Sequence, residues 1–373
     1  MKFKKNKRVI KIILITALFG FAGVGLIFSG VFVAMRLHLT DVKGSIDSRN
    51  EFFNKIKKEE ARFPTIKRAQ AATSFNKLNP EIECKIMTVL SVLPANGQKI
   101  LDTYMTTKSE VVADRMINAI VLVTENNNTF LKDKIDKCVG VIDTPSVYGD
   151  NPSSQSIFSW MTSPEWQTLS DALVKDKDVI NQASHDSGVP ARMIVSTVIS
   201  EQFRFFTANR EAFKKYLEPL KVLGNGTKFS YGVAGVKIET AKVIESNLKD
   251  KTSPFYLGAD FEDILNYGDR DPSTELMSRL TDNTNHYYSY LYTALFLKQI
   301  MHQWETAGFP INDRPEVLGT LFNIGFNKSE PKANPDVGGS TITIEQRDYT
   351  FGDLSYEFYY SGELSEYFPL GVQ

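Results

Sequence analysis

The stretch that decides the fold is Pro190-Ala-Arg-Met-Ile-Val-Ser-Thr-Val-Ile-Ser-Glu-Gln-Phe-Arg-Phe-Phe206. It predicts a helix, because proline is tolerated in a first helical turn, where its missing N–H has no partner to lose. Ile194, Thr197 and Val198 precede Glu201 at the spacing of one helical face. A carboxyl group therefore stands where this face calls for an apolar residue. The alternative is that Glu201 lies at a frayed helix end and faces water.

A carboxyl group on an apolar helix face is a candidate for acid catalysis. Loss of water disfavours the charged form, so burial is expected to raise the pKa of Glu201. A proton held near neutral pH is what a general acid needs when it protonates a departing sugar oxygen. This face therefore predicts that Glu201 is a general acid if the helix buries it.

Two later segments carry glycines at places where a ligand could approach. Ser230-Tyr-Gly-Val-Ala-Gly-Val-Lys-Ile-Glu-Thr-Ala241 puts two glycines in a short loop before a helix expected over 238–248. Glycine lets the backbone come close to a ligand or adopt positive φ. Leu318-Gly-Thr-Leu-Phe-Asn-Ile-Gly325 is an apolar run that ends in Asn-x-Gly.

In this order the segments resemble the lysozyme-like lytic transglycosylases, the superfamily of soluble lytic transglycosylases and goose-type lysozymes with its SLT domain. Gly188-Val-Pro-Ala-Arg-Met-Ile-Val-Ser-Thr-Val-Ile-Ser-Glu-Gln-Phe203 is similar to the family helix that delivers the catalytic glutamate. Gly232-Val-Ala-Gly-Val-Lys-Ile-Glu-Thr-Ala241 is similar to "G-L-M-Q-(I/V)-x-P-x-T-A", and Thr320-Leu-Phe-Asn-Ile-Gly325 to "A-x-Y-N-x-G". The resemblance covers about residues 180 to 330.

The resemblance implies a peptidoglycan lytic transglycosylase that cleaves between N-acetylmuramic acid and N-acetylglucosamine. Glu201 would protonate the glycosidic oxygen and then act as base while the sugar's own 6-hydroxyl closes an anhydro ring. The implied partner is the peptidoglycan glycan strand, and no cofactor or metal is expected. The residues implied to contact substrate are Gly232, Val233, Gly235, Thr240, Phe322, Asn323 and Gly325.

The chain departs from the family pattern in polar groups of the cleft. Gly235 replaces a glutamine, Phe322 replaces a tyrosine, and Gln202 replaces the serine after the catalytic glutamate. These changes favour an alternative function. The chain would then be a non-catalytic cell-envelope module that uses a degenerate lysozyme fold to bind glycan or to scaffold a larger assembly. A third reading is an unrelated helical envelope protein. Many glycosidases use two carboxylates, so a second acid would be needed beside Glu201. The candidates are Glu211, Glu239, Asp260, Glu262 and Asp263, and their positions in the sequence do not favour any one of them.

The amino terminus predicts a membrane anchor. Residues 12–35 are 24 residues without a charge, enough as a helix to cross a hydrocarbon core about 30 Å thick. Six of the seven basic residues among the first 37 precede this span, and no acid lies there. The positive-inside rule then places the amino terminus in the cytoplasm and the remainder outside, as a single-pass protein of the cell membrane.

The rest of the chain is acidic and contains both cysteines. Residues 38–373 carry a net charge of −8, the wrong sign for phosphate contacts with nucleic acid. Cys84 and Cys138 are expected to pair in an oxidising compartment, which would stabilise the fold by roughly 4 kcal/mol on the chain-entropy model. Two buried free thiols are the alternative.

The predicted fold class is mainly α (α+β), with one transmembrane helix, a helical spacer domain and a lysozyme-like domain that ends in a short β-hairpin. The Lys- and Glu-rich stretch after the anchor has a helical pattern. The hairpin is expected from the alternating residues at 341–345 and 349–351. A tyrosine-rich helix over 285–304 is expected to pack in the core. The predicted division is 1–37 tail and anchor, 38–72 stalk, 73–142 helical domain, 143–159 linker and 160–373 transglycosylase domain.

Overall fold

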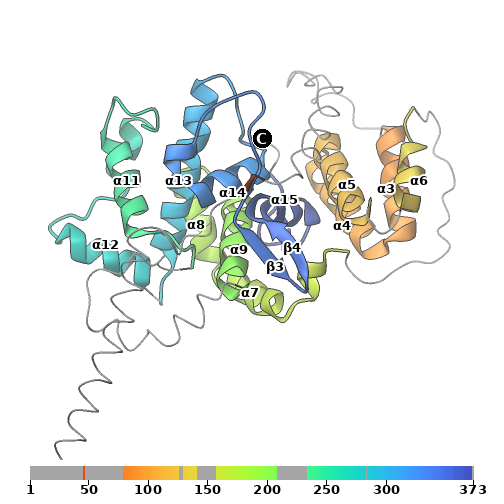
Figure 1. Cartoon of the computed structure of the whole chain (residues 1–373), viewed down its shortest axis with the longest axis horizontal. Helices are drawn as coiled ribbons and strands as arrows, with labels where there is room; N and C mark the ends of the chain where they lie inside the picture. The colour runs from red at the N-terminus through yellow and green to blue at the C-terminus, as the bar shows by residue number, and fades with distance from the viewer. Residues whose placement is uncertain are drawn as a thin grey trace, which may run out of the picture. The chain divides into compact units, whose positions relative to one another are not determined.

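The computed structural model describes residues 45–46, 79–125, 129–140, 157–207, 233–282 and 284–371. Over this part of the chain the fold is mainly helical, with a few very short strands (Figure 1). The predicted α-rich character is therefore confirmed. The stalk expected over 38–72 lies outside the described residues except for Ser45–Ile46, which form strand β1 rather than helix.

Four helices form the first described region and pack on one another. They are α3 (Pro80–Val92), α4 (Pro94–Thr107), α5 (Glu110–Glu125) and α6 (Thr129–Asp136). Pro94-Ala-Asn-Gly97 consists of residues common in turns and predicts a loop after a helix that ends near Leu93, and this prediction is wrong. They form the first turn of α4, because a proline in that turn gives up no hydrogen bond.

A disulfide bond joins the two ends of this region. Cys84 of α3 and Cys138, just beyond α6, have their sulfur atoms 2.01 Å apart and their Cα atoms 5.6 Å apart. Both cysteines are buried. The bond closes a sequence separation of 54 residues, so it restricts the unfolded chain more than it alters the folded one.

We expect the isolated protein to contain this bond and no free thiol. Alkylation of denatured, unreduced protein followed by mass spectrometry should find no modified cysteine, and reduction should expose both. Recovery of two alkylated cysteines without reduction would contradict the pairing of Cys84 with Cys138.

Among the described residues, seven further helices precede the carboxyl-terminal hairpin and helix. They are α7 (Pro164–Lys175), α8 (Lys177–Ser187), α9 (Ala191–Thr207), α11 (Ile238–Lys249), α12 (Pro272–Thr281), α13 (Tyr287–Thr306) and α14 (Pro315–Ile324). In the same ranges, 3₁₀ turns lie at Ser159–Thr162, Ala259–Phe261 and Phe326–Lys328. The apolar periodicity predicts helices over 164–175, 178–187, 190–206, 238–248, 273–280 and 285–304, and these are present as α7, α8, α9, α11, α12 and α13 within a few residues. No helix was predicted for α14, and a further helix predicted over 210–223 lies outside the described residues.

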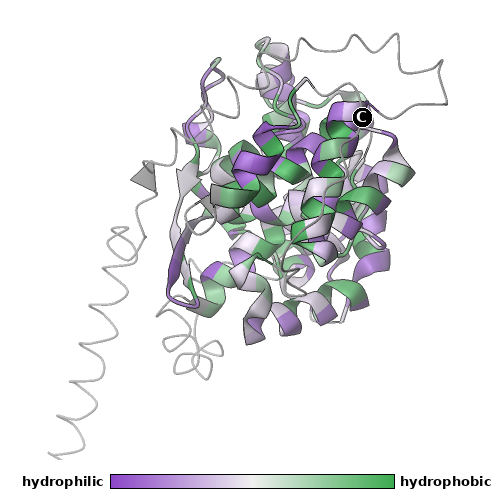
Figure 2. Cartoon of the chain, turned by 90° about the vertical axis from the view of Figure 1, so that its right-hand side faces the viewer, coloured by the Kyte–Doolittle hydropathy of each residue, from purple (hydrophilic) through white to green (hydrophobic). Residues whose placement is uncertain are grey.

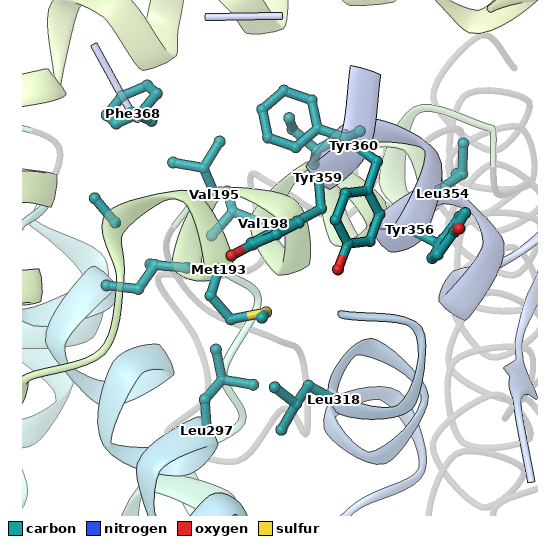
Figure 3. Packing of buried hydrophobic residues seen from close by; sticks show 14 of the residues in the cluster. Met193, Val195, Val198, Leu297, Leu318, Leu354, Tyr356, Tyr359, Tyr360 and Phe368 are labelled. Atoms are coloured by element: carbon teal, nitrogen blue, oxygen red, sulfur yellow. The ribbon is translucent and has the colours of Figure 1, made fainter. Parts of the chain in front are cut away.

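Helix α9 is the centre of this region. It contacts α7, α8, α13, α14, α15 (Phe351–Ser361) and strand β3 (Thr341–Ile344), and Figure 1 shows it surrounded by these elements. Every residue from Ala191 to Glu201 is buried. Figure 3 shows buried side chains of α9 (Met193, Val195, Val198) together with Leu297 of α13, Leu318 of α14, and Leu354 and Tyr359 of α15.

The carboxyl-terminal hairpin is present as predicted. Strand β3 pairs antiparallel with β4 (Arg347–Thr350), in a register that sets Ile342 opposite Tyr349. Strand β2 (Gly338–Gly339) pairs with β1. In Figure 2 the helices carry both green and purple turns, which is the pattern of helices that bury one side.

Helix α15 follows the hairpin directly, and the sequence did not predict it. Thr350 caps its first turn and Asp353 reaches back to the Thr350 amide, which completes a capping box. All of its residues are buried. The aromatic residues that were expected to pack back on the domain therefore do so as a helix.

A buried arginine ties α9 to the end of α15. The guanidinium of Arg192 donates to the carbonyl oxygens of Phe358 at 2.9 Å, Tyr359 at 2.6 Å, Glu363 at 2.8 Å and Phe368 at 3.0 Å. Two of these carbonyls lie in the last turns of α15, where helical partners run out. Burial lowers the pKa of Arg192 to about 10.

The first helical region contacts the later one through α5 and α15. Arg115 of α5 donates to the Tyr360 hydroxyl at 3.1 Å, and its guanidinium lies 2.7 Å from the carboxylate of Asp313. Lys99 of α4 pairs with Glu363 beyond α15. These contacts join the disulfide-bonded helices to the helix that packs on α9.

The predicted single transmembrane helix is corrected. Among the described residues, none of the helices combines the length and the apolar composition that a membrane span requires. The longest of them, α13, has 20 residues but carries Lys298, His302 and Glu305 along its second half. Its apolar residues pack inside the fold. Residues 12–35, on which the prediction was placed, lie outside the described residues.

Candidate functional site

Glu201 lies in the second half of the central helix α9 and is buried. Its residue exposure is 3%, which excludes the alternative that it faces water from a frayed helix end. The helix continues through Thr207, so Glu201 has almost two turns of helix after it. The expectation that the apolar face carries Glu201 into the interior is therefore correct.

The carboxylate of Glu201 is held by an arginine one turn further along α9. Arg204 donates from Nε to Oε2 at 2.9 Å and from Nη2 to Oε1 at 2.5 Å. The Arg204 side chain is only 13% exposed, so this two-point ion pair is largely shielded from water. Paired hydrogen bonds of this kind are shorter and stronger than neutral ones. Both oxygens of Glu201 thus accept hydrogen bonds from one side chain.

The sequence reasoning missed Arg204. Its signal was present, since an acid and a base three residues apart on a helix lie on neighbouring surface positions and can pair. The family pattern assigns a role to the glutamate and includes the residue directly after it, but it assigns no role to the arginine.

The backbone at Gly235 covers the same carboxylate. A Cβ atom built on Gly235 would lie 2.2 Å from Glu201 Oε1 and 2.8 Å from both Cγ and Cδ. The residue also has φ +63°, a conformation that favours glycine. A glutamine, which the family pattern has at this position, does not fit against Glu201 in this arrangement. The departure from the pattern thus has a steric reason.

We expect Gly235→Ala to destabilise the protein more than Gly268→Ala does. Gly268 has φ +60° and its added Cβ meets nothing within 4 Å, so it reports the backbone strain alone, about 1–2 kcal/mol. The additional loss of unfolding free energy in Gly235→Ala measures the cost of the contact between the new Cβ atom and Glu201. Urea unfolding of both variants provides the comparison, and equal losses would show that the carboxylate moves aside freely.

The loop before α11 is attached to α9 by Gln202. Its side-chain amide donates to the carbonyl oxygen of Val233, and the amide of Ala234 donates to Ser289 Oγ at 3.4 Å. Gln202 thus positions the loop that carries Gly235 over Glu201. Gly232, which the resemblance also placed in the cleft, lies outside the described residues.

The third motif lies on α14, which packs against α9. Asn323 accepts through Oδ1 from the Ser340 amide at 2.8 Å and from Ser340 Oγ at 3.0 Å, so it fastens α14 to the start of the hairpin. Phe322 is half-buried, with its ring centroid 5.1 Å from that of Phe296. Gly325 ends the helix at φ +93°. The contacts of these three residues hold α14 in place within the fold.

The remaining predicted cleft residue, Thr240, is half-buried in the first turn of α11. Of the acids weighed as a second carboxylate, Glu239 and Asp260 are exposed, and Glu262 accepts from the Tyr256 hydroxyl at 2.6 Å. Asp263 is exposed, and position 211 lies outside the described residues. None of these observations assigns a second acid.

Tyrosines of α13 donate hydrogen bonds to acids on α8 and α11 and to Asp176, which lies between α7 and α8. The hydroxyls of Tyr287 and Tyr290 donate to Asp186 at 2.6 Å and Asp176 at 2.8 Å, and that of Tyr292 donates to Glu245. Tyr290 and Tyr292 are buried, as the core-packing prediction requires. Burial, together with the bond to Glu245, raises the pKa of Tyr292.

No group of three or more His, Cys, Asp or Glu side chains in the described ranges is arranged to hold a metal ion. Comparison with known proteins gives no match, since no family model, no curated protein and no solved structure is similar to this chain at a significant level.

Proposed function

We propose that this chain is a peptidoglycan lytic transglycosylase in which Glu201 is the general acid and base. One observation supports this most: Gly235 lies directly against the Glu201 carboxylate. These residues belong to two motifs that the family resemblance assigned to one cleft, and they are 34 positions apart in the sequence. Their contact is what a shared site requires.

The proposed reaction uses one carboxyl group twice. Protonated Glu201 transfers its proton to the glycosidic oxygen as the bond between that oxygen and C1 of the muramic sugar breaks. The same sugar's 6-hydroxyl then bonds to C1, and its proton returns to the Glu201 carboxylate. The result is a 1,6-anhydro end, and no water is consumed. A reaction of this kind needs no second acid.

A glycan-binding module without catalysis is the second candidate, and the ion pair favours it. Both oxygens of Glu201 accept hydrogen bonds from Arg204, so in this arrangement neither carries a proton toward a ligand. The two candidates make different demands on Arg204, because catalysis requires its side chain to leave at least one oxygen and binding does not.

We also propose that the described residues from Asn79 onward lie outside the cytoplasm. The disulfide between Cys84 and Cys138 supports this location, because such bonds persist in oxidising compartments. A compartment beyond the cytoplasmic membrane is also where peptidoglycan lies.

The test is digestion of purified peptidoglycan sacculi by the full chain, followed by mass spectrometry of the soluble products. A transglycosylase releases fragments that end in 1,6-anhydromuramic acid. Reducing ends would show that water is the acceptor. Co-sedimentation with sacculi without release of fragments would support the binding module.

A further inference from the structure

The short strand β2 has a different kind of partner on each of its two edges. Helix α14 lies along one edge. The amide of Gly338 donates to Thr320 Oγ1 at 3.0 Å, and the carbonyl oxygen of Gly338 lies 3.4 Å from the same hydroxyl. The amide of Ser340 donates to Asn323 Oδ1 at 2.8 Å. Since Thr320 and Asn323 are one helical turn apart, one face of α14 holds two alternate residues of this segment.

Gly339 stands between these two residues and faces the other way. In an antiparallel ladder, pairs of residues that exchange hydrogen bonds alternate with pairs that do not, because successive residues present their N–H and C=O groups to opposite edges. Strand β1 pairs with β2 along the edge away from α14, with Ser45 opposite Gly339. The second pair sets Ile46 opposite Gly338. Gly338 uses both of its groups on α14, so the bonded pair is Ser45 with Gly339.

The pairing at this edge depends on the backbone of a glycine. Gly339 has φ +97°, a conformation that favours glycine, and a Cβ atom built on it would lie 3.0 Å from both Asn323 Oδ1 and Phe351 Cβ. Both residues of β2 are buried. A buried N–H or C=O group needs a hydrogen-bond partner, and at Gly339 strand β1 supplies it.

We propose that β1 is an intramolecular strap, which closes the outer edge of β2 at Gly339 and opens without unfolding the helices around it. The contact is weak, because one residue pair exchanges only two hydrogen bonds and each shifts an equilibrium by about fivefold. A separate peptide gains too little from two such bonds, whereas a segment of the same chain is held at a high effective concentration. The occupant is therefore the chain's own Ser45–Ile46. Opening leaves a strand edge that is free to pair with another extended segment.

The test compares two proline variants of the full chain by amide hydrogen exchange at single-residue resolution. Ser45→Pro removes the N–H that bonds to Gly339, so the Gly339 amide should exchange at least about fivefold faster than in wild type. Ile46→Pro places the same residue in the same strand but removes an N–H that points away from β2. The Gly339 rate should then change less than about twofold. The Gly338 amide, bonded to Thr320, should keep its rate in both variants.

A third variant examines the opposite edge. Thr320→Val keeps the shape of the side chain but removes the hydroxyl that accepts from the Gly338 amide. The Gly338 amide should exchange at least about fivefold faster, while the Gly339 rate stays close to that of wild type. Thermal unfolding verifies that each variant is folded.

Faster exchange of the Gly339 amide in Ser45→Pro alone supports the strap. Equal acceleration in both proline variants overturns the assigned pairing, as does a Gly339 amide that is unprotected in wild type. Protection of Gly339 that increases with protein concentration overturns the intramolecular strap, because a second copy would then supply the strand. None of these outcomes depends on cleavage of sacculi, so failure of the proposed function leaves the strap untouched.

Discussion

Glu201→Gln is expected to lower the rate of release of soluble fragments from sacculi at least about 100-fold, since general acid–base catalysis typically contributes about 10²–10⁴ in rate. The amide keeps the size of the side chain and an oxygen that accepts from Arg204, but it has no proton to transfer. The substitution also breaks the shielded ion pair with Arg204, so a loss of stability is expected. Thermal unfolding therefore has to verify that the variant is folded before the rates are compared.

The matched control for this variant is Glu239→Gln. Glu239 lies in the first turn of α11, close in sequence to the loop at Gly235, but it is exposed. Its substitution should lower the rate less than tenfold. A Glu201→Gln protein that cleaves as fast as wild type, together with an inactive Glu239→Gln protein, would mean that the acid has been assigned to the wrong residue.

Arg192→Met is expected to have the largest effect on stability, a loss of roughly 4–6 kcal/mol. Four buried carbonyl oxygens would lose a charged donor, and each such loss costs about 1–3 kcal/mol. The sum is partly offset because the variant no longer has to bury a charge. The measurement is the free energy of unfolding from urea titration followed by circular dichroism.

Arg270→Met is the control for this prediction. Arg270 pairs with Glu275 at 2.7 Å, but its side chain is 70% exposed, and exposed ion pairs contribute about 0–1 kcal/mol. A loss of less than about 1 kcal/mol is expected there. If Arg192→Met loses no more than Arg270→Met, then the end of α15 is held by packing and the four hydrogen bonds contribute little.

The sequence by itself determined most of the helices, because local apolar periodicity predicted them, although it did not predict α15. The stretch from Pro190 predicted α9 almost to the residue, and the alternating residues at 341–350 predicted the hairpin. The burial of Glu201 was predictable for the same reason, since it occupies a position on an apolar face. Where local signals conflicted, the prediction failed, as at Pro94, whose turn-forming neighbours concealed the start of α4.

Only the tertiary structure decided what the buried groups contact. Gly235 lies so close to the Glu201 carboxylate that an added Cβ atom would collide with it. This contact forms because the loop before α11 folds back onto α9, and the sequence spacing does not predict it. Arg192 interrupts an apolar helix in the sequence, and only the fold brings to it two carbonyl oxygens of α15 and two from the segment that follows α15. The anchor predicted over 12–35 came from its uncharged length and its basic flank, and these residues lie outside the described part of the chain. Local sequence thus specifies helices and their buried faces, because 3.6-residue periodicity is a short-range property. The pairing of buried charges is set by which distant segments pack together, and that is a property of the fold.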